Sequence, residues 1–242
     1  MGVHAYAPNL AINGDIGWTS CNIRRKAEMI RLWNRLISFD DSRITKQVLI
    51  HDLNNRGNNW SKEIKQISID VGMIEYFENM LPMPVEEIKM LLYENQKNAW
   101  KENIVNVPKL RTYIKYKTEL ACEPYVNLLQ DRGKRSIMAQ FRSGILPLSV
   151  ETGRYSDVPL EFRLCLFCQS QEIENETHFI FYCACYEELR SVLIEKAKLE
   201  FNDFNDLDND SKLVMLMGKK LVKETATYLH SAFYKRQSIL YK

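Results

Sequence analysis

The chain has 242 residues, 45% of them hydrophobic, which is enough to bury a core and argues against a disordered chain. Its 33 basic and 31 acidic residues leave a formal net charge of +2, so the local distribution of charge is more informative than the total. The sequence contains no apolar run of the ~20 residues that a membrane span needs, and no secretory signal pattern at its start. We therefore expect an intracellular protein, nuclear or cytoplasmic and not secreted, with reduced cysteines and no membrane partner.

The first half of the sequence predicts a lead-in followed by helices. Residues 1–21 contain a proline, three glycines and no sustained period, which predicts an extended segment. Apolar residues then recur at helical spacing, and acidic residues follow Pro84 as they do in the first turn of many helices. These patterns predict helices over 22–37, 44–53, 60–71 and 85–102, with an Asn/Gly-rich turn at 54–58.

The second half is also expected to be mostly helical. Residues 109–120 alternate partly like a strand and partly like a helix, and the sequence leaves this choice open. Elsewhere the patterns predict helices over 126–129, 134–141, 186–201 and 211–241, with an Asn/Asp-rich turn at 202–210. The expected fold class is therefore mostly α, with bundle-like helical segments that are interrupted in the C-terminal third by a cluster of cysteines.

Four of the six cysteines lie between positions 165 and 185, where metal binding is the usual explanation in a reducing compartment. Cys165 and Cys168 form a C-x2-C pair, and His178 and Cys183 follow as H-x4-C. Three thiolates and one imidazole suit a closed, tetrahedral, structural zinc site. Two alternatives remain open at this point: Cys185 could replace Cys183, and the cysteines and histidine could be ordinary buried residues.

Basic residues gather in two segments. Residues 22–37 hold five basic residues and one acidic residue, and residues 101–142 hold nine basic and four acidic residues. In a functional interpretation the basic side chains nearest the cysteines bind RNA or DNA phosphates, while Tyr113, Tyr116 or Phe141 stacks on bases. The alternative is that these charges are solvated faces of amphipathic helices. The predicted phosphate-binding residues are Arg132, Lys134, Arg135, Arg142 and Arg154.

The order of features around the cysteines resembles the zinc-binding region that follows the polymerase in reverse transcriptases of non-LTR retrotransposons. A basic helix at 135–142, a loop with Gly144 and Pro147, C-x2-C, an acidic pair and H-x4-C follow one another within RSIMAQFRSGILPLSVETGRY and LCLFCQSQEIENETHFIFYCACY. The block GDIGWTSCNIRRKAEMIRLWNRLI also looks like the stretch just after the polymerase core. The resemblance favours Cys183 over Cys185 as the fourth ligand.

The resemblance implies nucleic-acid binding without polymerisation. The nearest match to the family's aromatic-x-Asp-Asp motif, Phe39-Asp40-Asp41, follows a predicted helix rather than a strand, so we interpret its aspartates as helix-end and capping residues, and we expect no enzyme activity from this chain. Two further alternatives are a zinc-stabilised protein-interaction module and a non-functional transposon-derived fragment. The expected domains are a lead-in at 1–21, a post-polymerase helical region at 22–130, a basic helix with the zinc knuckle at 131–201, and C-terminal helices at 202–242.

Overall fold

The computed structural model describes residues 2, 6–55, 57 and 59–240. The residues outside this set, 1, 3–5, 56, 58, 241 and 242, include parts of the predicted lead-in, of the predicted turn at 54–58 and of the last predicted helix. The described chain is helical and has no strand, only two isolated β-bridges, Ile16 with Cys122 and Leu164 with Ile173. This confirms the predicted mostly helical fold. No described helix combines the length and the apolar character needed to cross a membrane.

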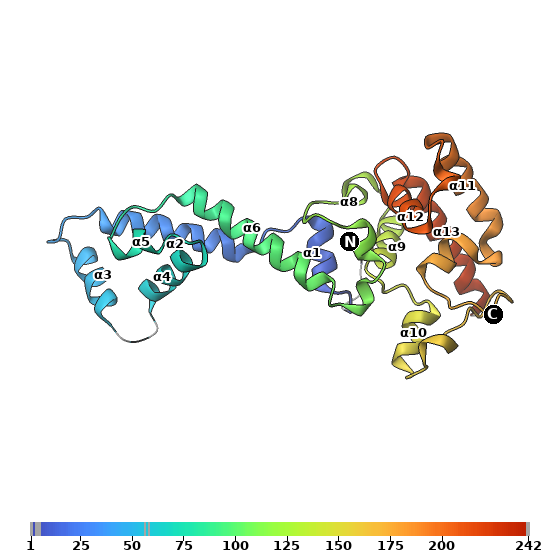
Figure 1. Cartoon of the computed structure of the whole chain (residues 1–242), viewed down its shortest axis with the longest axis horizontal. Helices are drawn as coiled ribbons and strands as arrows, with labels where there is room; N and C mark the ends of the chain where they lie inside the picture. The colour runs from blue at the N-terminus through green and yellow to red at the C-terminus, as the bar shows by residue number, and fades with distance from the viewer. Residues whose placement is uncertain (1, 3–5, 56, 58, 241–242) are drawn as a thin grey trace. The chain divides into compact units, whose positions relative to one another are not determined.

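The chain divides into two compact units, with one boundary after Trp18 and the other within helix α6 (Val85–Ile104) (Figure 1). Unit 1 consists of residues 1–18 and 100–242, and unit 2 consists of residues 19–99. Unit 2 is therefore continuous in sequence, whereas unit 1 is assembled from two separate stretches of the chain.

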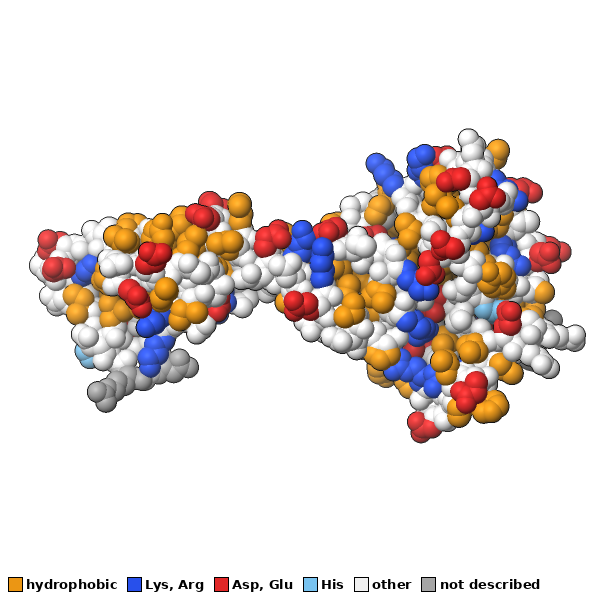
Figure 2. Space-filling view, in the orientation of Figure 1, with side chains coloured by type: hydrophobic (Ala, Val, Ile, Leu, Met, Phe, Trp, Pro, Cys, Tyr) orange, Lys and Arg blue, Asp and Glu red, His pale blue; other side chains and the backbone are white. Residues whose placement is uncertain are grey.

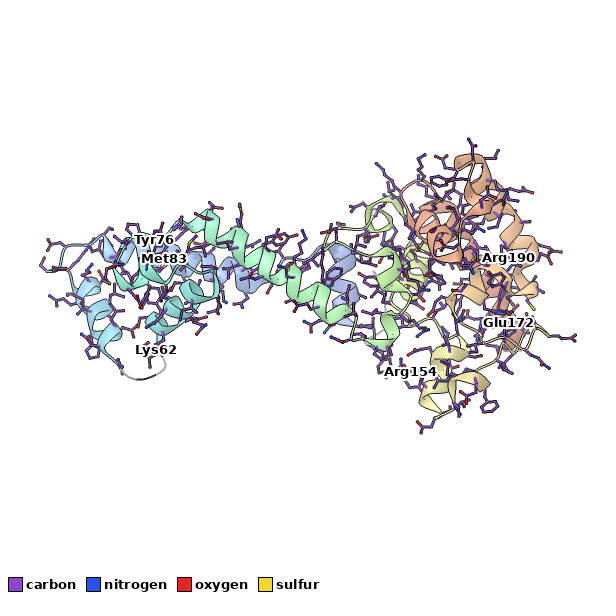
Figure 3. The ribbon with its side chains drawn as sticks, in the orientation of Figure 1. Lys62, Tyr76, Met83, Arg154, Glu172 and Arg190 are labelled. Carbon is purple, nitrogen blue, oxygen red and sulfur yellow. The ribbon has the colours of Figure 1, made fainter. Side chains whose placement is uncertain are left out.

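Unit 2 contains the helices that periodicity predicted in the first half of the sequence. Its core includes Ile30 and Trp33, and the amide of Asn34 bonds both the N–H and the C=O of Met83, at 2.8 and 2.7 Å (Figure 3). These bonds hold the segment before α6 against α2. The elements of unit 2 are α2 (Cys21–Ile37), α3 (Ile44–Asn54), α4 (Trp60–Asp70), α5 (Ile74–Glu78) and the first part of α6 (Val85–Ile104).

Unit 1 has one large hydrophobic core, to which both the cysteine region and the C-terminal helices contribute. Residues 109–120, which the sequence left open, form helical turns rather than a strand. Helix α13 packs against both α9 and α11. The elements are α1 (Asn9–Ile16), η1 (Pro108–Leu110), α7 (Tyr113–Tyr116), α8 (Pro124–Leu128), α9 (Arg132–Arg142), α10 (Ser149–Tyr155), η2 (Leu160–Phe162), η3 (His178–Tyr182), η4 (Ala184–Tyr186), α11 (Glu187–Glu200), η5 (Phe204–Asp206), α12 (Asn209–Met217) and α13 (Val222–Leu240).

Helix α1 lies within the segment that was expected to be an extended lead-in. It carries Asp15, which is buried and accepts hydrogen bonds from the hydroxyls of Tyr113 and Tyr125 at 3.0 and 2.8 Å. Gly14 lets the helix approach this closely, because a Cβ atom at this position would lie 2.7 Å from the Trp100 ring. Gly17, in the left-handed conformation at φ 63°, ends the helix. Tertiary contacts of unit 1 thus support a helix that has little amphipathic pattern of its own.

The predicted domain ranges do not coincide with the two compact units. The expected boundaries at 130/131 and 201/202 both fall inside unit 1, where Tyr125, Met138, Phe204 and Leu229 belong to one core cluster. Long-range packing of this kind leaves no composition change in the sequence, so the boundaries could not be found from linker signals.

Candidate metal centre

The four predicted ligands converge in unit 1. One ligand atom from each of Cys165, Cys168, His178 and Cys183 lies within 4.8 Å of the others, and among the described residues this is the one such group of histidine, cysteine and acidic side chains. The Cys165 and Cys183 sulfurs are 3.8 Å apart, and the Cys168 sulfur is 3.3 Å from Nε2 of His178. A disulfide needs ~2.05 Å between its sulfurs, so these are free thiols. The cluster could hold a metal ion.

The first two ligands lie on a tight turn. The backbone N–H of Cys165 donates to the carbonyl of Glu172 at 2.8 Å, next to the isolated bridge between Leu164 and Ile173. This closes a loop that brings Cys168 back toward Cys165. The backbone N–H groups of Phe167 and Cys168 help to lower the pKa of the Cys165 thiol, after the larger effect of Cys183. Amide donors of this kind stabilise a thiolate at the metal-facing side of the turn.

The other two ligands come from one wide helical turn. In η3 the N–H of Cys183 donates to the carbonyl of His178 at 2.8 Å, which spans five residues as in a π-helix. In an α-helix, with about 3.6 residues per turn, two residues five positions apart point to different sides of the helix. The wider turn instead brings His178 and Cys183 to the same side.

A carboxylate holds the imidazole of His178 in place. His178 is 3% exposed, and its Nδ1 lies 2.9 Å from Oε2 of Glu172 (Figure 3). When Nδ1–H donates to this carboxylate, Nε2 keeps its lone pair and faces Cys168. Metal-bound histidines commonly have such a partner on the second nitrogen. The sequence analysis missed Glu172, although an acidic residue six positions before the histidine was a visible signal.

The sequence left two candidates for the fourth ligand, Cys183 and Cys185, and the position of Cys185 favours Cys183. Its thiol donates to the backbone carbonyl of Phe167 at 2.6 Å, and it is not part of the convergent group. Cys183 is fully buried and points at Cys165. The Cys183 thiol, by donating to Cys165, lowers the pKa of Cys165 to about 5, while the same bond raises the pKa of Cys183. The two sulfurs therefore share one hydrogen bond, which shifts their pKa values in opposite directions.

Helices α11 and α13 fasten the cluster to the core of unit 1. From α11, Arg190 donates to the carbonyl of Cys183 at 2.9 Å (Figure 3). From α13, the buried guanidinium of Arg236 pairs with Glu174 at 3.0 Å and lies over the ring of Phe167. Both contacts reach the loops that carry the ligands, so the packing of these helices and the geometry of the cluster depend on each other.

Arg142, one of the predicted nucleic-acid ligands, is not available to bind a phosphate. Its side chain is 1% exposed, donates two bonds of 2.9 Å to Asp15, and pairs with Glu123 at 2.8 Å. Of the three aromatic residues expected to stack on bases, Tyr113 and Phe141 are fully buried and Tyr116 is partly buried. Their positions on the inner faces of α7 and α9 explain the error, because charge and aromatic character alone do not show which face of a helix is buried.

The other four predicted residues lie on α9 and α10. Arg132 is exposed in the first turn of α9, Lys134 donates to the hydroxyl of Thr227 at 2.9 Å, and Arg135 is partly buried with a 2.7 Å bond to the carbonyl of Leu129. Arg154 lies on α10 (Figure 3). Figure 2 shows Lys and Arg side chains in a row on one face of unit 1, with Asp and Glu side chains among them.

Arg154 belongs to a small cluster that the sequence analysis did not single out. Arg154 and Lys109 pair with the two oxygens of Glu151, at 3.4 and 3.1 Å. The Lys109 ammonium also lies 3.1 Å from the hydroxyl of Tyr155 and 5.5 Å from the centre of its ring. Tyr155 is 69% exposed. The cluster thus places an exposed aromatic ring beside the Lys109 ammonium, and Lys109 and Tyr155 lie 46 positions apart in the sequence.

Comparisons of the chain with protein families, curated proteins and solved structures found no match.

Proposed function

We propose that Cys165, Cys168, His178 and Cys183 bind one structural Zn²⁺. A tetrahedral site with Zn–S and Zn–N distances of ~2.3 and ~2.05 Å has S···S edges of about 3.8 Å and S···N edges of about 3.5 Å. The distances of 3.8 Å between Cys165 and Cys183 and 3.3 Å between Cys168 and His178 are close to these values, and this agreement carries the proposal. Four protein ligands leave no position for water, so the role is structural rather than hydrolytic.

The ion would join the turn that carries Cys165 and Cys168 to the turn that carries His178 and Cys183. It contributes on the order of 10 kcal/mol to ordering such a segment, by analogy with isolated zinc fingers. In unit 1 this stabilises the ligand loops between α10 and α11.

The experiment is the metal content of the purified chain by elemental mass spectrometry, beside Cys165→Ser and His178→Ala. One zinc per wild-type chain and none in either variant is expected. Cys122→Ser is the matched control, because Cys122 is exposed and outside the convergent group, and it should keep the zinc. A folded wild-type protein without zinc would contradict the proposal.

We further propose that unit 1 binds RNA or DNA, and that the chain is the C-terminal, zinc-binding part of a non-LTR retrotransposon reverse-transcriptase-like protein. The order of motifs from the basic helix to H-x4-C supports the family, and the exposed Arg132 with the partly exposed Lys134 and Arg154 supports the binding. The exposed ring of Tyr155 beside Lys109 suits a single strand, because any base can stack on an exposed aromatic side chain.

The proposal assigns no catalytic residue. Asp40 of the Phe39-Asp40-Asp41 run accepts bonds from the N–H and the hydroxyl of Ser42, at 2.9 and 2.6 Å, between α2 and α3. These bonds lower the pKa of Asp40 and are typical of a turn-capping residue. The described residues around it include no strand that would carry a polymerase palm.

Binding is tested with fluorescent single-stranded RNA and DNA oligonucleotides over a range of salt concentrations. In the triple variant Arg132→Ala, Lys134→Ala, Arg154→Ala, the slope of log K against log salt should fall by roughly 0.7–0.9 for each phosphate contact removed. Lys198→Ala, on the exposed side of α11, should leave the slope unchanged. Absence of binding at low salt would refute the nucleic-acid proposal without affecting the zinc proposal.

A further inference from the structure

An open groove of about 280 Å³ runs between α11 and α13 in unit 1, away from the four metal ligands. Its floor is formed by Leu193 and Tyr228, which are almost completely buried. Leu189 and Val192 line its α11 side, and Val192 is 60% exposed. We call this surface, lined among others by Leu189, Val192, Leu193, Lys196, Lys223 and Tyr228, the α11/α13 groove.

The spacing of the lining residues fits a helical occupant. On α11 the positions 189, 192, 193 and 196 follow the i, i+3, i+4, i+7 pattern, so they form one stripe about 10 Å long. Leu199 extends the stripe by another turn and is 83% exposed. Two helices that present parallel stripes with a gap between them accept a third helix, whose apolar side chains fill the gap.

The charges at the groove specify the character of this helix. Lys196 and Lys223 are exposed and line the groove, and Lys134 reaches it through its 2.9 Å bond to the hydroxyl of Thr227. Glu224 is the one acidic residue that lines it. Two lining cations against one lining anion, with Lys134 bonded to the lining Thr227, favour an occupant with acidic flanks.

The same surface is poorly suited to a nucleic acid. Its apolar side chains are aliphatic, apart from Tyr228, whose ring is buried and whose hydroxyl donates to the carbonyl of Phe179 at 2.7 Å. No exposed aromatic ring is therefore available in the groove for a base to stack on. An aliphatic floor with basic edges matches the apolar face and the acidic flanks of a peptide helix.

We propose that the α11/α13 groove binds an acidic amphipathic helix of a protein partner. The helix lays leucine-like side chains over Leu193 and Val192, while its carboxylates pair with Lys196 and Lys223. This inference rests on the groove alone and is independent of the metal and of nucleic-acid binding.

The test uses the full chain as purified and a fluorescein-labelled synthetic peptide of about 15 residues, long enough to form a helix. The peptide carries leucines at i, i+3, i+4 and i+7 and glutamates on its flanks, and a second peptide has lysines in place of the glutamates. Binding is measured by fluorescence anisotropy. Val192→Glu, and separately Lys196→Glu with Lys223→Glu, should weaken binding of the acidic peptide by about tenfold or more. Lys198→Glu, also on α11, is the matched control and should change it less than about threefold, because Lys198 does not line the groove.

Tighter binding of the acidic peptide, with loss in the groove variants only, would support the proposal. Absence of binding, equal binding of the lysine peptide, or unchanged binding by Val192→Glu would overturn it. Displacement of the peptide by a single-stranded oligonucleotide that itself loses binding with Val192→Glu would assign the groove to nucleic acid and also overturn the proposal. Circular dichroism of each variant establishes that a loss of binding is not a loss of folding.

Discussion

Replacing Arg142 by alanine is expected to destabilise unit 1 by about 3–5 kcal/mol, which is the usual cost of removing one partner from a buried ion pair. The guanidinium is 1% exposed and makes two bonds of 2.9 Å to Asp15 and one of 2.8 Å to Glu123. Without it, the Asp15 carboxylate stays buried with the hydroxyls of Tyr113 and Tyr125 as donors, which do not compensate its charge. The loss is a large fraction of the ~5–15 kcal/mol by which domains are stable.

The free energy of unfolding is measured by urea titration followed by circular dichroism and tryptophan fluorescence. At about 2–4 °C for each kcal/mol in a domain of this size, the thermal midpoint should fall by about 10 °C. The double variant with Asp15→Asn should be less destabilised than the sum of the two single variants, because both remove the same contact. Arg132→Ala is the control, since Arg132 is exposed and should affect stability by less than about 0.5 kcal/mol.

Unchanged stability of Arg142→Ala together with weaker nucleic-acid binding would refute this reasoning. It would mean that Arg142 reaches a phosphate after all, as the sequence alone suggested.

Four further outcomes are expected. Glu172→Ala should lower zinc affinity about 10–100-fold in competition with a chelator, since it frees the ring of His178, and an unchanged affinity would contradict this role. Cys185→Ser should retain one zinc per chain by elemental analysis, whereas loss of the metal would make Cys185 a ligand. Gly14→Ala should destabilise unit 1 by about 1–3 kcal/mol in urea, because its Cβ has no room, and a neutral effect would show that α1 can shift. Tyr155→Ala should weaken binding of single-stranded oligonucleotides by about 1–3 kcal/mol while Tyr155→Phe keeps the affinity, and equal behaviour of the two variants would exclude stacking.

The sequence predicted those features that depend on local spacing. Apolar periodicity located α2, α3, α4 and α6, because a helix that packs on one face repeats its apolar residues every three or four positions. The spacing of the cysteines and His178 predicted the ligand set that the fold brings together, since C-x2-C and H-x4-C each place two ligands on one short turn.

Features that depend on distant contacts could not be predicted. Arg142 is a basic residue in a basic segment, and its partner Asp15 lies 127 residues earlier. Helix α1 has no strong periodicity, so its formation depends on Trp100 and Tyr113, which no local pattern connects to it. The cluster of Lys109, Glu151 and Tyr155 likewise exists only in the folded chain.

The two-part composition of unit 1 has a consequence for how the chain folds during synthesis. Residues 19–99 are continuous in sequence and have a hydrophobic core of their own, so we expect them to fold once they have left the ribosome. Helix α1 is made before Arg142, so its Asp15 can be neutralised only once the next 127 residues, up to Arg142, have been synthesised. Contacts of such wide sequence separation form slowly, so α1 remains exposed to proteases and competing partners longer than any other part of unit 1. A shortened chain that begins after residue 18 would never make this contact, and its Arg142 would be buried opposite Glu123 alone.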